Sequence, residues 1–83
     1  MPLFMDVHSK VAGATAEAVA DAHEQDLAIQ DHYGVRYLKY WLDEGTGQIF
    51  CLVEAPSKEA AMAVHRHAHG LVADDIFEVI EAS

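Results

Sequence analysis

The chain has few of the features that would tie it to an oxidising compartment or to a membrane. Its 83 residues include a single cysteine, Cys51, so no intrachain disulfide can form and nothing requires an oxidising environment. No apolar stretch approaches the roughly 20 residues of a transmembrane helix. The N-terminal segment lacks the basic start and long apolar run of a signal peptide. We therefore expect a cytoplasmic protein with no membrane partner.

Positive charge is also scarce. Five Lys and Arg residues stand against 14 Asp and Glu residues, which gives a formal net charge of −9. Such a chain repels phosphate backbones, so the composition disfavours a nucleic-acid partner. An acidic surface suits cations, although it also serves simply to maintain solubility. Hydrophobic residues make up 52% of the chain, which argues against disorder.

The order of the predicted elements indicates the fold class. Apolar alternation and β-rich runs predict strands at 3–8, 35–42, 48–54 and 76–80. One helix is predicted over 15–33, between the N-cap Thr15 and Gly34, and a second between the N-cap Ser57 and Gly70. This β-α-β-β-α-β order is that of the ferredoxin-like α+β fold, with two helices on one face of a four-stranded antiparallel sheet. We expect one such domain over residues 1–83, with a small core that a metal or a partner subunit would reinforce.

The other face of the sheet is expected to meet a second copy of the chain. We assign to this free face the following residues: Phe4, Asp6, His8, Ile76, Glu78 and Ile80. Its apolar members predict a homodimer that packs sheet against sheet with twofold symmetry. The nearly uniform apolar run 49–53 predicts a central strand, and Cys51 within it is interpreted as part of the buried core.

The first predicted helix carries polar residues in or beside its apolar stripe. The stripe gathers Val19 and Leu27, and its polar neighbours are His23, Asp26 and Gln30. We interpret these three as side chains that reach solvent at the edge of the stripe or satisfy one another.

Half of the six histidines lie in the segment "HRHAH" at 65–69. On a helix, His65 and His69 share one flank because they are four residues apart, whereas His67 lies about 160–200° from both. Such a pair can hold one metal ion, as in HExxH proteins, but the glutamate base of those hydrolases is missing here. The alternative is two solvated histidines that the helix dipole favours near a C-terminus.

The direction of the predicted elements brings more metal-ligating residues to the same end of the domain. The first strand ends with Asp6 and His8, and the last strand carries Glu78 near its start. Alternatively, Asp6 and Glu78 line a water-filled groove between subunits, where a proton, a cation or Lys39 would have to separate them. The predicted metal ligands are His65, His69, His8, Asp6 and Glu78, with His67 as an additional candidate.

Four segments of the chain resemble a known family in their order and spacing. They are "AHEQDLAIQDHYGVRYLKYW", "FCLVEAP", "HRHAHG" and "ADDIFEV". The chain resembles the small actinobacterial nickel-binding proteins with a ferredoxin-like fold, long described as a domain of unknown function. The resemblance implies a dimer of βαββαβ units that binds Ni²⁺ through histidine and carboxylate side chains and water. His65 and His69 match the paired histidines before the glycine, whereas His67 departs from that pattern.

We favour a non-enzymatic nickel(II)-binding protein that acts in metal storage, buffering or sensing. Ligation by nitrogen and oxygen without thiolate fits Ni²⁺, and also Zn²⁺, Co²⁺ or Cu²⁺. No catalytic residue is assigned, because no nucleophile or oxyanion donor is evident beside Asp6 and Glu78.

Two alternatives to metal binding remain at this point. The first is a small dimeric α+β barrel enzyme, an isomerase or cofactor-free monooxygenase-like protein, with His8 or Asp6 as the base. Its organic substrate would lie in the groove between the sheets, lined by the aromatic residues Tyr37, Tyr40, Trp41 and Phe4. The second alternative is a dimerisation module without a ligand.

Overall fold

The computed structural model describes residues 1–9 and 11–82. The strands are β1 (Leu3–His8), β2 (Arg36–Asp43), β3 (Gln48–Glu54) and β4 (Asp75–Val79). The helices are α1 (Ala16–Ile29) and α2 (Lys58–Ala68), and a short 3₁₀ turn, η1 (Gln30–Tyr33), follows α1. The β-α-β-β-α-β order confirms the predicted ferredoxin-like α+β fold.

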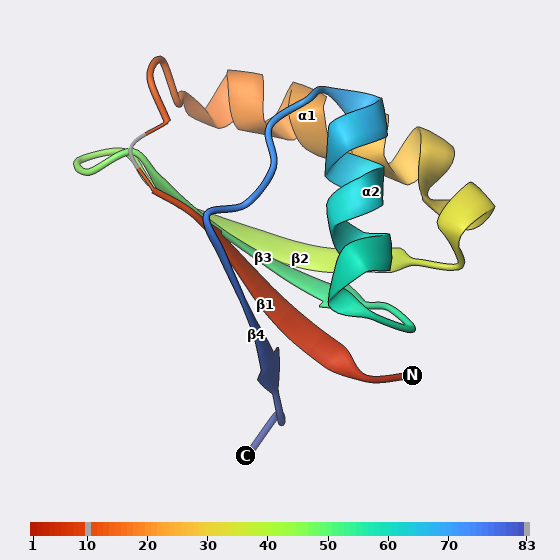
Figure 1. Ribbon diagram of the computed structural model, residues 1–83. Coiled ribbons are helices and arrows are strands. Elements are labelled where there is room, and N and C mark those ends of the chain that lie inside the picture. Colours follow the sequence, from red (N-terminus) through yellow and green to blue (C-terminus); the bar gives the residue numbers. More distant parts are fainter. Residues whose placement is uncertain (10, 83) are drawn as a thin grey trace.

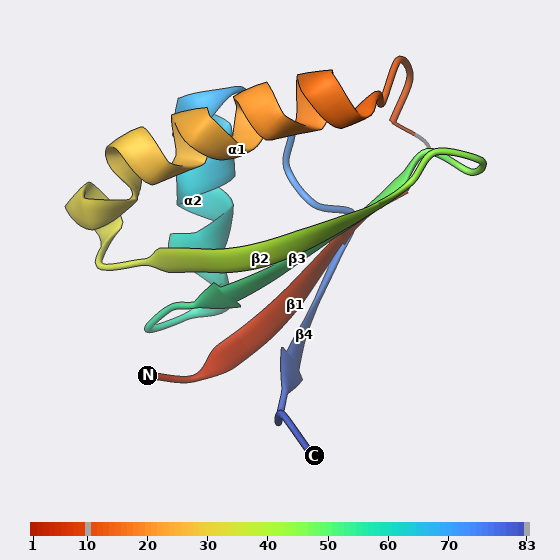
Figure 2. The ribbon, with the colours of Figure 1, turned by 180° about the vertical axis from the view of Figure 1, so that it is seen from behind.

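The four strands form one antiparallel sheet in the order β2-β3-β1-β4. Strand β3 is central, as its apolar run predicted. Both helices lie over the same face of the sheet, with α1 crossing it and α2 standing more steeply against it (Figure 1). The view from behind shows that no other described element covers the opposite face (Figure 2). Neither described helix has the length and apolar character needed to cross a bilayer.

Local signals set the ends of both helices. The hydroxyl of Thr15 accepts the backbone N–H of Ala18 at 3.1 Å, and that of Ser57 accepts the N–H of Ala60 at 3.1 Å. These bonds satisfy N–H groups that have no partner within the helix. Gly70 follows the end of α2 with a φ of 84°, a left-handed conformation that glycine adopts without steric cost. The capped helix therefore stops at the point where its last turn presents the histidines.

The prediction of which face of β1 is covered was wrong. Phe4, Asp6 and His8 face the helices, with exposed fractions of 4%, 1% and 4%. Ile76 lies opposite Asp6 in the sheet and also packs against the core. Alternation in a strand shows that two faces differ, but it does not show which one is covered. Two polar residues are tolerated under the helices because polar residues of the helices meet them there.

Strand β2 contains a bulge that changes which of its side chains face the helices. Tyr37 lies opposite Val53 and Lys39 lies opposite Leu52, so Leu38 is an extra residue in the ladder. Tyr37 is buried and Tyr40 packs against the core, although strict alternation would place them on opposite faces. Lys39 lines the free face instead, so it does not neutralise Asp6 as one alternative required.

The core lies between the helices and the sheet. Its fully buried side chains include Val35, Val53, Ala61 and Val64. Leu27 was expected in the inner stripe of α1 but is 42% exposed. The stripe of α1 instead buries Val19 and, unexpectedly for a carboxylate, Asp26.

Candidate metal centre

His65, in the second half of α2, occupies the middle of a buried polar cluster and is 2% exposed. Its Nδ1 lies 2.9 Å from Oδ1 of Asp26 on α1, and its Nε2 lies 3.1 Å from Oδ2 of Asp6 on β1. Carboxylates accept hydrogen bonds, so both ring nitrogens act as donors here. His65 is therefore an imidazolium held between two carboxylates.

The pKa values of the three groups reflect this pairing. Burial alone would lower the pKa of His65, but Asp26 and Asp6 outweigh it and raise that pKa from 6.5 to about 9. Burial would raise the pKa of the Asp6 carboxyl, yet His65, His8 and Tyr37 hold it well below its usual range. His65 and His69 likewise outweigh burial and lower the pKa of Asp26. The two carboxylates and one imidazolium carry one net negative charge, which suits a cation.

The two oxygens of Asp6 have different surroundings. The Tyr37 hydroxyl donates to Oδ2 at 2.8 Å and also lies 3.1 Å from the carbonyl oxygen of Ala61. Oδ1 is buried and has no hydrogen-bond partner among residues 1–9 and 11–82. Nε2 of His8 lies 3.3 Å from Oδ1 but does not form a hydrogen bond with it. A buried carboxylate oxygen without a donor is costly unless a cation compensates it.

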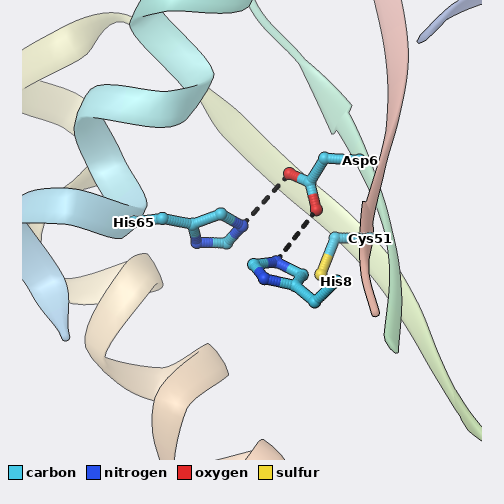
Figure 3. A group of neighbouring side chains, drawn as sticks. All are labelled: Asp6, His8, Cys51 and His65. Atoms are coloured by element: carbon cyan, nitrogen blue, oxygen red, sulfur yellow. Dashed lines mark hydrogen bonds and ion pairs between the residues drawn. The ribbon is translucent and has the colours of Figure 1, made fainter. Parts of the chain in front are cut away.

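Four side chains converge around this oxygen (Figure 3). A carboxylate oxygen of Asp6, a ring nitrogen each of His8 and His65, and Sγ of Cys51 lie within 4.8 Å of one another. We call these four residues the inner group. Cys51 lies opposite Asp6 in the β1–β3 ladder, so both side chains point toward the helices. Burial and the neighbouring Asp6 raise the pKa of the Cys51 thiol.

A second set of potential ligands, Asp26, His65 and His69, lies on the α1 side of the His65 ring. We call it the outer group. Nε2 of His69 lies 3.1 Å from Oδ1 of Asp26, and Nδ1 of His69 accepts the backbone N–H of Leu71 at 3.1 Å. Because Nδ1 accepts, it carries no proton, so the proton of the neutral ring is on Nε2 and faces Asp26. Within the outer group, His69 thus donates to Asp26, and Asp26 in turn holds Nδ1–H of His65.

A pocket of about 130 Å³ borders the cluster. Inner-group and outer-group residues line part of it, and small apolar residues such as Ala14, Val19 and Ala22 form much of the remaining wall. His23 and Tyr40 also line the pocket, with their ring centroids 4.7 Å apart. This volume is large enough for several water molecules. An ion in the cluster could therefore keep part of its hydration shell.

The structure brings together four of the six predicted ligands, namely His65, His69, His8 and Asp6. Glu78 is exposed on β4 opposite Phe4 and belongs to neither group. His67 is also exposed, and its Nδ1 lies 3.1 Å from the hydroxyl of Tyr33. As the helical spacing predicted, His67 points away from the pair.

The sequence interpretation missed the role of Asp26. This residue was expected to reach solvent or to pair with His23 or Gln30, but it is 3% exposed and contacts His65 and His69. Gln30 instead accepts the backbone N–H of Tyr37 at 2.8 Å. One feature of the sequence could have indicated this role. Asp26 lies inside the apolar stripe of α1, and His65 and His69 lie beside the apolar stripe of α2, so the three could meet where the helices pack. Cys51 is buried, as predicted, but its sulfur also belongs to the inner group.

The enzyme alternative required a base in the groove on the free face of the sheet. The two candidate bases, His8 and Asp6, both point to the helices, as do Tyr37 and Phe4. That version of the enzyme hypothesis is therefore wrong.

Comparison with known proteins assigns the chain to a family. A family described as "Nickel responsive protein SCO4226-like" matches residues 4–79. The crystal structure of SCO4226 from Streptomyces coelicolor A3(2) superposes with a TM-score of 0.90 at 41% sequence identity, covering 98% of this chain and 99% of that one. No curated protein matches the sequence. The chain therefore belongs to the SCO4226-like family of nickel responsive proteins.

Proposed function

We propose that this protein binds Ni²⁺ through histidine and carboxylate side chains and acts in nickel storage, buffering or sensing rather than in catalysis. One observation carries the proposal: the buried Oδ1 of Asp6 lacks a hydrogen-bond partner among the described residues and lies beside His8 and His65. A divalent cation would compensate this oxygen and the net negative charge of the cluster. The description of the family as nickel responsive supports the choice of metal.

The proposed protein ligands are Asp6, His8 and His65. His65 would bind through Nε2, because its Nδ1–H is held by Asp26, and His69 supports Asp26 in turn. Such a carboxylate behind a ligating histidine fixes the ring and raises its basicity. Water in the pocket would complete the octahedral coordination that Ni²⁺ accepts, although Zn²⁺, Co²⁺ and Cu²⁺ favour similar donors. His67 and Glu78 lie outside this centre.

Calorimetric titration of the protein with NiCl₂, after stripping with a chelator, tests the proposal. We expect a dissociation constant below about 1 mM, which corresponds to about −4 kcal/mol. His8→Ala removes a ligand and should weaken binding at least about tenfold, since the loss of a supporting residue alone costs about 10- to 100-fold. His67→Ala is the matched control, because His67 is exposed and contacts Tyr33 instead. Absent binding, or equal effects of the two substitutions, would refute the proposed centre.

We also propose that the protein is a homodimer formed through the free face of the sheet. The free face is lined by Leu3, Met5, Leu52 and Trp41 and has a hollow of about 410 Å³. Trp41 is 48% exposed and Phe77 is 52% exposed, so large apolar side chains face solvent in the single chain. A second copy would cover them with an identical surface. We place this dimer in the cytoplasm, where a single thiol such as Cys51 stays reduced.

A further inference from the structure

We infer that Cys51 supplies a thiolate to the nickel centre, which is then one sulfur-containing site per chain built from the inner group. This inference rests on the proposed function and changes the chemistry of its site. Histidine and carboxylate ligands alone would form a nitrogen and oxygen centre. A cysteine ligand makes the centre softer and alters which metals it selects.

The position of Cys51 in the sheet brings its sulfur close to the other proposed ligands. Cys51 lies directly opposite Asp6 in the β1–β3 ladder, so its side chain emerges beside the Asp6 carboxylate on the helix side. Its Sγ lies within 4.8 Å of the ligand atoms of Asp6, His8 and His65 (Figure 3). All four residues are buried. An ion that reaches Oδ1 of Asp6 is therefore also within reach of the sulfur.

A buried cysteine alone would carry little weight, because free cysteine often packs as a small hydrophobe. The Asp6 side chain provides an independent observation. It is 1% exposed, and its Oδ1 points into the same space without a hydrogen-bond partner within the described parts of the chain. A neutral thiol is too weak a donor to compensate a buried carboxylate oxygen. A cation shared by the carboxylate and the sulfur compensates both groups.

The charges of the proposed ligands balance that of the ion. A divalent ion bound by the Asp6 carboxylate, the Cys51 thiolate and two neutral imidazoles has no net charge, which suits a buried site. The thiol and Nε2 of His65 each release their proton to solvent when the metal–sulfur and metal–nitrogen bonds form. Asp26 keeps the remaining proton of His65 on Nδ1.

The outer group does not form a second site beside the first. His69 already accepts the N–H of Leu71 through Nδ1, so its Nε2 carries the proton and offers no lone pair to a metal. His65 has a single lone pair once it is neutral, and a metal in the inner group uses it. The cluster therefore holds one ion per chain, with Asp26 and His69 as positioning residues.

The test is titration of the stripped protein with Ni²⁺ and Co²⁺, followed by near-ultraviolet absorption and calorimetry. The wild-type protein should develop a sulfur-to-metal charge-transfer band that saturates at one ion per chain. Cys51→Ala should abolish the band and weaken binding at least about tenfold, because it removes a ligand. His69→Ala is the matched variant: it should weaken binding but keep the band, since His69 only supports Asp26. Circular dichroism establishes that each variant is folded.

The outcomes separate this inference from the proposed function. If the wild-type protein binds nickel without a charge-transfer band, and Cys51→Ala binds equally well, the thiolate is refuted while nickel binding stands. If Cys51→Ala and His69→Ala each lose one whole ion from a wild-type total of two, the single shared site is refuted. If no metal binds at all, the proposed function fails as well. Should Cys51→Ala not fold, the band in the wild-type and His69→Ala proteins still decides whether sulfur is bound.

Discussion

At the scale of single residues, His65 connects the two helices to the sheet. It comes from α2 and contacts Asp26 of α1 and Asp6 of β1 through its two ring nitrogens. The helical spacing of the sequence predicts that His65 and His69 share a flank, which is local information. The burial of His65 depends on the carboxylates of Asp26 and Asp6, which are 39 and 59 residues away in the chain. No local pattern contains that information.

The raised pKa of His65 makes the stability of the chelator-treated protein depend on pH. Because this pKa rises from 6.5 to about 9 on folding, the contribution is fully present below pH 6.5 and is lost as pH rises to 9. A pKa change of this size corresponds to at most about 3 kcal/mol in the free energy of unfolding. Urea unfolding should therefore give a lower free energy of unfolding at pH 9 than at pH 6.5.

His23 does not confuse this measurement. Burial lowers its pKa, so His23 increases the free energy of unfolding as pH rises through 6.5, which is opposite in sign to the expected loss. The exposed His32 provides a control, and His32→Ala should keep the full pH dependence. A free energy of unfolding that stays constant from pH 6.5 to 9 would show that His65 is not held as an imidazolium.

At the scale of elements, the sequence predicts the strands and helices to within a few residues, because caps, glycines and periodicity are local features. The prediction for β1 matches the strand Leu3–His8, and Thr15 and Ser57 cap their helices. The choice of the covered face failed for β1, since alternation is symmetric with respect to the two faces. The bulge at Leu38 also has no signature in the sequence, because it depends on how β2 pairs with β3.

The N-cap of α2 should matter for stability more than for metal binding. Ser57 lies at the opposite end of α2 from His65, and its hydroxyl accepts the N–H of Ala60. Ser57→Ala should lower the free energy of unfolding by about 1 kcal/mol, as measured by urea unfolding. Ser57→Asp retains a capping oxygen and should stay close to the wild-type value. An equal loss in both variants would mean that the cap does not stabilise α2.

At the scale of the whole molecule, the free face predicts a dimer that substitution can dissociate. Trp41→Asp places a charge among the apolar side chains of this face and should weaken the dimer by about 2 kcal/mol or more, roughly 30-fold. Light scattering after size-exclusion chromatography reports the mass. The control is Leu27→Asp, because Leu27 is 42% exposed but lies on α1, away from the sheet. A monomeric wild-type protein, or dissociation by Leu27→Asp alone, would contradict an interface through the sheet.

The bulge in β2 has a consequence for how copies of the chain meet. Strand β2 is an edge of the sheet, and an edge strand with free N–H and C=O groups can add a strand from another molecule. The extra residue Leu38 interrupts the regular spacing of these groups and increases the local twist. The same irregularity that turns Tyr37 and Tyr40 toward the buried core therefore makes this edge a poorer template for a strand from another molecule.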